Sequence, residues 1–248
     1  LTLNDPDRRN ALSEAMLAAL DETFDAASTN PDVRVIVLAA VGPVFCAGHD
    51  LKEMTAGRQN VDRGRAYFTK ILHQCSSVMQ KIVTCPKPVI AEIDGVATAA
   101  GCQLVASCDL AVASETAQFC TPGVHIGLFC STPMVALSRN MANKHAMEML
   151  LTGDMVSASR AAEMGLVNQV VPSADLCAGS MALAGKIAAK SSLTVATGKR
   201  AFYKQKEMDL EAAYNYASKI MVDNMLARDA KEGIAAFIEK RVPDWHDE

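Results

Sequence analysis

Residues 33–40, Val-Arg-Val-Ile-Val-Leu-Ala-Ala, restrict the fold of this chain more than any other segment. The segment is rich in β-branched residues and apolar at every position but one, so it lacks the alternation of a half-exposed strand. Near-continuous apolarity is typical of a strand with both faces covered, in a sheet flanked by helices. We predict further strands at residues 89–93 and 109–113, and a strand end at residues 1–4.

Helical segments separate these strands. Apolar residues from Leu12 to Phe24 recur with the 3.6-residue period of a helix, and Ser13 is a suitable N-cap. Two more helices are predicted, over about residues 67–82 and over residues 99–107. Residues 41–50 contain Gly and Pro and are predicted to be a loop. The alternation of strands with helices predicts an α/β fold.

The character of the sequence changes after about residue 191. Residues 194–241 contain no strong strand signal and show the pattern of several amphipathic helices. We therefore divide the chain into a core, residues 1–193, and a helical C-terminal subdomain, residues 194–248.

Composition argues against several classes of protein. Of the 248 residues, 50% are hydrophobic and 21% are charged, as in an ordinary globular protein. The formal net charge of −4 argues against a nucleic-acid-binding protein. No run of 18 apolar residues is present, so the sequence predicts no membrane span. The sequence opens with Leu-Thr-Leu rather than Met, so any targeting peptide is expected to lie outside it.

The chain has eight cysteines, but none forms a C-x-x-C pair. No Cys/His spacing resembles a zinc site, so no metal is predicted. Most of the cysteines lie in apolar surroundings, and we interpret them as buried reduced thiols. Reduced thiols indicate an intracellular protein.

Three loop segments carry the most specific information. They are Phe-Cys-Ala-Gly-His-Asp-Leu-Lys at 45–52, Asp-Gly-Val-Ala-Thr-Ala-Ala-Gly-Cys-Gln-Leu at 94–104 and Ala-Gln-Phe-Cys-Thr-Pro-Gly-Val-His-Ile-Gly at 117–127. Each one alone is only a loop of small residues. Together, in this order and spacing, they resemble the crotonase (enoyl-CoA hydratase/isomerase) family, and the resemblance extends over essentially the whole chain.

The resemblance implies a crotonase-like spiral core of repeated ββα units. It also implies that the helical region 194–248 forms trimers, often paired as hexamers. The ligand would be an acyl-CoA thioester, such as a fatty acyl-CoA, with coenzyme A entering as part of the substrate and no separate cofactor. The location would be the cytoplasm of a bacterium or the mitochondrial matrix of a eukaryote.

The chemistry shared by the family is stabilisation of a thioester enolate by two backbone N–H groups. By resemblance the donors here are His49 and Ala100, and each aimed amide contributes about 10²–10³ in rate. The dipole of the helix predicted to start near Ala100 favours negative charge at that point. Because the donors are backbone groups, a change of side chain does not remove them. We expect the His49 side chain only to line the coenzyme A entrance.

By resemblance, four further residues are expected to contact the substrate. Lys52 would lie near the phosphates of coenzyme A. Phe237 and Lys240 would reach the ligand of a neighbouring subunit. Ser131 falls in Phe-Cys-Ser-Thr-Pro, where relatives have a turn near the substrate.

The sequence departs from the family at the two glutamates with which its hydratases hold a water and move protons. Gln103 occupies the first position and Gly123, 20 residues later, occupies the second. Neither can transfer a proton at pH 7, whereas a positioned acid or base contributes typically about 10²–10⁴ in rate. Efficient hydration is therefore not expected, and restoring both glutamates is expected to raise it.

Few residues could replace the glutamates. Asp109 and Glu115 are expected to be structural or exposed, and Cys120 lies near the third loop. His125 is suited to be a base but is expected to face away. Two functions stay open: an acyl-CoA hydratase/isomerase with weak or altered activity, and a catalytically silent acyl-CoA binder or regulatory oligomer subunit. A structural role without a ligand fits less well, because both donor loops and Lys52 are present.

Overall fold

The computed structural model of the chain describes all of residues 1–248 and contains two sheets. The larger sheet has five strands in the order β1-β2-β4-β6-β9, and every neighbouring pair is parallel. Their bounds are β1 Thr2–Leu3, β2 Ile36–Ala40, β4 Val89–Ile93, β6 Leu110–Ser114 and β9 Gln169–Val171. The predicted strands at 33–40, 89–93 and 109–113 are thus present, with shifts of up to three residues at their ends.

The smaller sheet has the order β3-β5-β7-β8. Its first three strands are parallel, and β8 is antiparallel to β7. Their bounds are β3 Val44–Cys46, β5 Val96–Thr98, β7 Gln118–Cys120 and β8 Val156–Ser157. The prediction of a loop over residues 41–50 is wrong at β3. That strand has only three residues and is formed by pairing with β5, so local sequence carries no signal for it.

The path of the chain between the sheets is a spiral. Each of the pairs β2/β3, β4/β5 and β6/β7 passes from the larger sheet to the smaller one, and each new pair lies beside the previous pair. The turn between β4 and β5 uses Gly95, where a Cβ would collide with the Pro43 carbonyl oxygen. The predicted α/β core of repeated ββα units is confirmed.

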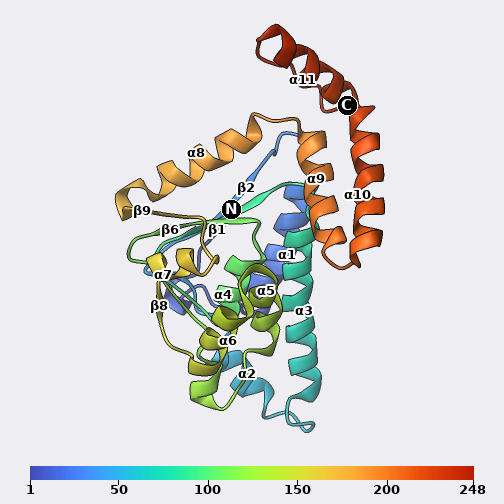
Figure 1. Cartoon of the computed structure of the whole chain (residues 1–248). Helices are drawn as coiled ribbons and strands as arrows, with labels where there is room; N and C mark the ends of the chain where they lie inside the picture. The colour runs from blue at the N-terminus through green and yellow to red at the C-terminus, as the bar shows by residue number, and fades with distance from the viewer.

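Helices cover the sheets (Figure 1). Helix α1, Glu14–Thr29, begins where predicted, and the Ser13 side chain accepts a hydrogen bond from the Met16 amide. Helices α3, Arg65–Thr84, and α4, Ala100–Ser107, also lie where the sequence places them, whereas the short helix α2, Leu51–Gly57, had no counterpart in the predictions. The remaining core helices are α5 Ser131–Asn140, α6 Asn143–Thr152, α7 Ala158–Glu163 and α8 Leu176–Ala188, with short 3₁₀ turns at Pro6–Arg8, Pro122–Ile126 and Ser173–Asp175.

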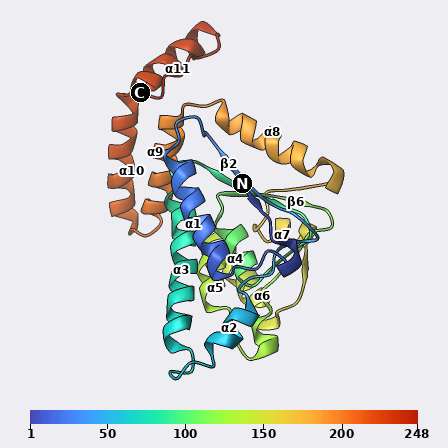
Figure 2. The same cartoon turned by 180° about the vertical axis from the view of Figure 1, so that it is seen from behind.

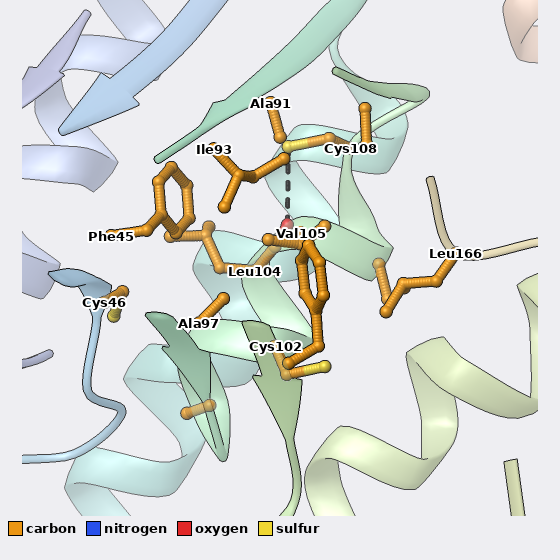
Figure 3. Close-up of a cluster of buried hydrophobic side chains, with 14 of the residues drawn as sticks. Phe45, Cys46, Ala91, Ile93, Ala97, Cys102, Leu104, Val105, Cys108 and Leu166 are labelled. Carbon is orange, nitrogen blue, oxygen red and sulfur yellow. Dashed lines mark hydrogen bonds between the residues drawn. The ribbon is translucent and has the colours of Figure 1, made fainter. Parts of the chain in front are cut away.

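Helix α4 lies at the centre of the core, and all eight of its residues are buried. Figure 3 shows Leu104 and Val105 among side chains of both sheets, including Phe45 and Ile93. A Cβ at Gly101 would collide with the carbonyl oxygen of Cys46, so α4 packs directly against the backbone of β3. This contact fixes the N-terminus of α4 beside the chain that leaves β3.

Three helices, α9 Ser192–Gln205, α10 Leu210–Met225 and α11 Arg228–Glu239, form the C-terminal region. The absence of strands there agrees with the sequence, while the division at residue 193 stays a prediction. Helix α9 is anchored by Lys199, whose ammonium donates to Asp109 at 2.7 Å and to the Ile82 and Lys87 carbonyls. No residue of α9 or α10 is buried. In both views α11 projects beyond the body, at the opposite end from α2 (Figures 1 and 2).

The chain after α11 folds back and fastens it. Buried Asp229 accepts hydrogen bonds from the amides of His246 and Asp247 at 2.9 and 3.0 Å. The Trp245 indole donates to the Ala189 carbonyl at 3.0 Å, next to the start of α9. The position of α11 is therefore set by specific contacts. No helix anywhere in the chain combines the length and the apolarity that crossing a membrane needs.

Candidate functional site

The two loops predicted to carry the amide donors meet in the structure. Gly48 follows β3 and has φ +83°, a left-handed conformation that favours glycine. A Cβ at Gly48 would lie 3.0 Å from the amide nitrogen of Ala100 and 3.0 Å from the Ala99 side chain. Both its conformation and its surroundings therefore require glycine at position 48, and the close approach brings His49 beside the N-terminus of α4.

Neither donor amide is used within the protein. The His49 N–H takes part in no backbone hydrogen bond outside regular elements. Ala100 is the first residue of α4, so its N–H has no intrahelical acceptor, and it donates to no other group. The preceding residue, Ala99, has φ 52° and ψ −118°, a strained conformation for a residue with a side chain. Strain held beside an unused amide pair is typical of a functional site.

The His49 side chain was expected to line the coenzyme A entrance, and that role stays a prediction. Both of its ring nitrogens are buried, and their one polar contact is a weak hydrogen bond with the Leu12 backbone. Burial lowers the pKa of the imidazole below its usual value, and the contact with Leu12 opposes this only in part. The ring is therefore neutral at pH 7, with one donor and one acceptor nitrogen.

Gln103 lies one turn after Ala100 on α4, so both residues share one face of the helix. It is only 4% exposed, and its Oε1 atom is buried without a hydrogen-bond partner. An amide in this position can bind a ligand or a water, but it cannot take up a proton at pH 7.

Gly123 lies in the 3₁₀ turn Pro122–Ile126 and is buried. It is not among the residues with positive φ, so its backbone conformation does not demand glycine. Packing does, because a Cβ would lie 2.9 Å from the Leu128 carbonyl oxygen and 2.9 Å from the Cys130 sulfur. Residues 128–130 fill the space that the side chain of a glutamate at position 123 would occupy. The sequence analysis did not predict this contact, because no local pattern shows that residues 128–130 fold back over Gly123.

The alternative acids and bases are occupied elsewhere or ill-suited. Asp109 accepts from Lys199 and from the Tyr203 hydroxyl, which confirms its structural role. His125 is exposed, and its Nε2 lies 2.8 Å from the Thr152 carbonyl. Burial raises the pKa of the Cys120 and Cys130 thiols, which keeps both protonated. Asp109, His125, Cys120 and Cys130 are thus engaged in other contacts or held protonated.

The expected substrate contacts lie at different ends of the chain. Lys52 is exposed on α2, in a shallow surface groove, and directly follows the donor loop. Phe237, 85% exposed, and Lys240, at the end of α11, lie on the projecting arm. Within one chain, α11 and α2 therefore lie far apart (Figures 1 and 2). Ser131 is the exposed first residue of α5, with Cys130 as the N-cap, and its contact with substrate stays a prediction.

A family model described as enoyl-CoA hydratase/isomerase matches residues 1–248. The chain therefore belongs to the enoyl-CoA hydratase/isomerase family, the crotonases, as its loops and fold indicate. It is 50% identical to human enoyl-CoA hydratase domain-containing protein 3, mitochondrial, over 248 residues, which cover all of this chain and 80% of that protein.

Solved structures agree over almost the whole chain. The crystal structure of an enoyl-CoA hydratase of Mycobacterium smegmatis is 53% identical, with a TM-score of 0.94, covering 99% of this chain and 93% of that one. The crystal structure of the human domain-containing protein 3 is 49% identical, with a TM-score of 0.92, covering 98% and 94%. The fold class is thus shown independently of the loops.

Proposed function

We propose that this protein binds an acyl-CoA thioester with the thioester oxygen between the amides of His49 and Ala100. The observation that carries the proposal is the pair of unused N–H groups on two loops in contact, one of them at a helix N-terminus. Such donors stabilise the negative charge of an enolate where water is excluded. Lys52 would bind a phosphate of coenzyme A, which enters as part of the substrate, and no separate cofactor is proposed.

As an enzyme, the protein would act in the hydratase/isomerase class with low efficiency. The amide pair can stabilise an enolate, but Gln103 and Gly123 offer no proton donor or acceptor. The neutral imidazole of His49 is a weakly basic side chain on one of the two donor loops. A weak or altered reaction on fatty acyl-CoA thioesters is therefore the enzymatic form of the proposal.

A catalytically silent acyl-CoA binder or regulatory subunit is the second candidate. It is favoured by the packing around Gly123, which closes the place of the second glutamate rather than leaving it open. Relatives at about 50% identity carry mitochondrial names. By analogy we place this protein in the mitochondrial matrix if its source is eukaryotic, and in the cytoplasm if bacterial.

The experiment that separates these candidates combines titration with an assay of turnover. We expect calorimetric titration to detect binding of crotonyl-CoA, and we expect its enoyl absorbance to decay at a rate at least about 10²-fold below that of a relative with both glutamates. Lys52→Ala is expected to weaken binding of free coenzyme A and crotonyl-CoA alike. Absence of binding would overturn the proposal, whereas fast hydration would show that another base does the work.

We further propose that the C-terminal helices form a homotrimer, or a hexamer made of two such trimers. Helices α10 and α11 expose a series of large apolar side chains: Tyr214, Met221, Val222, Met225, Leu226, Ile234, Phe237 and Ile238. Large exposed apolar side chains gathered on two successive helices are typical of an association surface. Helix α11 also places Phe237 and Lys240 far from the His49 and Ala100 loops of the same chain. This is expected if the two residues complete the site of a neighbouring subunit.

Sedimentation at micromolar concentration tests this assembly. We expect a trimer or a hexamer for the unmodified protein, and smaller species for Leu226→Asp, since a charge at an 82% exposed apolar position would be buried on association. Val61→Asp, at a fully exposed apolar residue outside the arm, is the control and should leave the assembly unchanged. A monomeric unmodified protein would contradict the proposal.

A further inference from the structure

Residues 244–248, the tail, join α11 to the rest of the molecule. The Asp244 amide donates a hydrogen bond to the Glu232 carboxylate of α11 at 2.9 Å. The Asp229 amide, in the first turn of α11, donates to the Glu248 carbonyl oxygen at 3.0 Å. The tail therefore runs beside α11 and is hydrogen-bonded to it at both of its ends.

The Asp229 carboxylate lies at the centre of these contacts and is only 1% exposed. It accepts from the His246 and Asp247 amides, and the Ser191 hydroxyl, at the start of α9, contributes a further hydrogen bond. Burial alone would raise the pKa of Asp229, but these hydrogen bonds hold it below its usual value. A buried charge is costly unless its hydrogen-bonding capacity is used, so Asp229 ties the start of α11 to both the tail and α9.

The tail also binds the linker between α8 and α9. The Asp247 carboxylate accepts from the Ser192 amide at 2.6 Å and pairs with the Arg34 guanidinium at 3.0 Å. Arg34, which lies just before β2, donates in turn to the Ala188 and Lys190 carbonyls. These bonds involve charged groups and are stronger than neutral ones. The tail is thus fixed to the larger sheet and the linker as well as to α11.

Trp245 is the one tryptophan of the chain, and it lies between α11 and the linker. Its indole N–H donates to the Ala189 carbonyl at 3.0 Å. A Cβ at Gly233, in the interior of α11, would lie 2.9 Å from the Trp245 ring. Glycine is unfavourable inside a helix compared with alanine. At position 233 it allows the indole to lie directly against the helix backbone.

The direction of α11 depends on these tail contacts. Only Asp229 and Ala236 of α11 are buried, and the helix projects beyond the body (Figures 1 and 2). Phe237 and Lys240, the residues proposed to reach a neighbouring ligand, lie at its far end. Residues 228–240 span about 18 Å, so a tilt of about 10° would move Lys240 by about 3 Å, the length of a hydrogen bond.

We propose that the tail positions Phe237 and Lys240 for coenzyme A bound in a neighbouring subunit. Trp245 and Asp229 are the positioning residues, and neither touches the ligand itself. This inference rests on the proposed function and assembly, and it gives residues 244–248 a part in ligand affinity. The thioester contact at the donor loops is independent of the tail, because it is made by other elements of the fold.

Gly233→Ala tests the proposal, because the added methyl group displaces the indole from α11. We expect the emission of Trp245 to shift to longer wavelength as the ring enters water. Calorimetric titration should show an affinity for free coenzyme A about tenfold lower, as for the loss of one base–aromatic contact. Crotonyl-CoA should weaken by the same factor, since its thioester contact is unchanged. Gly185→Ala, at an exposed glycine of α8 with open space around it, is the matched control and should change neither readout.

Substitutions of Trp245 give a second test that does not depend on a methyl group inside α11. Trp245→Ala should reproduce the tenfold loss of coenzyme A affinity. Trp245→Phe keeps an aromatic ring against Gly233 and should recover most of that affinity, although it lacks the indole N–H. The affinities are compared at a protein concentration at which sedimentation gives the same oligomer for each variant. If Gly233→Ala does not fold by circular dichroism, the two Trp245 variants decide the question.

The outcomes separate this inference from the proposed function. A folded Gly233→Ala protein with shifted emission and unchanged coenzyme A affinity would overturn the positioning role but not the binding of acyl-CoA. Unchanged emission would overturn it too, as would tail variants that do not assemble at any concentration, because the contacts would then serve assembly. If the unmodified protein binds neither coenzyme A nor crotonyl-CoA, the proposed function and this inference are both overturned.

Discussion

Proline at position 100, introduced into an Ala99→Gly background, is expected to weaken binding of a nitronate analogue of the thioester enolate by about 10²–10³-fold, the value of one aimed amide donor. Proline lacks the N–H, and the first residue of a helix tolerates it. The background change is needed because a residue before proline is restricted, and Ala99 has φ 52° and ψ −118°.

The matched control is Ala99→Gly alone, which should bind the analogue as tightly as the unmodified protein. Free coenzyme A has no thioester carbonyl, so its affinity should be the same in all three proteins. Circular dichroism and thermal melting show whether the proline variant is folded. Unchanged analogue affinity in a folded proline variant would exclude Ala100 as an oxyanion donor.

Gln103→Glu is expected to raise the rate of crotonyl-CoA hydration by about 10²-fold or more, the lower range for one positioned acid or base. Glutamate has the shape of glutamine, so the buried position can hold it without repacking. The enoyl absorbance assay used for the unmodified protein measures the change. Gln103→Met is the control and should give no gain, because it fills the same space without a carboxyl group.

The structure changes what we expect from a glutamate at position 123. From sequence, restoring both carboxylates should give the largest gain. In the structure a Cβ at Gly123 meets the Leu128 carbonyl oxygen and the Cys130 sulfur at 2.9 Å each. Gly123→Glu should therefore destabilise the fold by about 1–3 kcal/mol through overpacking, measured by denaturant unfolding, and should add little to the rate of Gln103→Glu. A double variant with the stability of the parent and a further large gain would show that segment 128–130 moves aside.

The strands of the larger sheet and the long helices were accessible from the sequence, because their signals are local. A β-branched run such as that at 36–40, or the cap Ser13 before a periodic helix, acts within a few residues of chain. The family was also accessible, since the three loops keep their residues and spacing. Lys52 and the two donor positions followed from that resemblance.

Tertiary contacts decided what local patterns could not. Strand β3 exists only through its pairing with β5, and the loop that carries His49 lies against the start of α4 only because α4 packs against the β3 backbone. The burial of the His49 ring, the unpartnered oxygen of Gln103 and the closed space at Gly123 each arise from residues distant in the chain. The sequence determined which chemical groups the site contains. The packing of the spiral determined which of them are left without partners, because burial and hydrogen-bond satisfaction are properties of the whole fold.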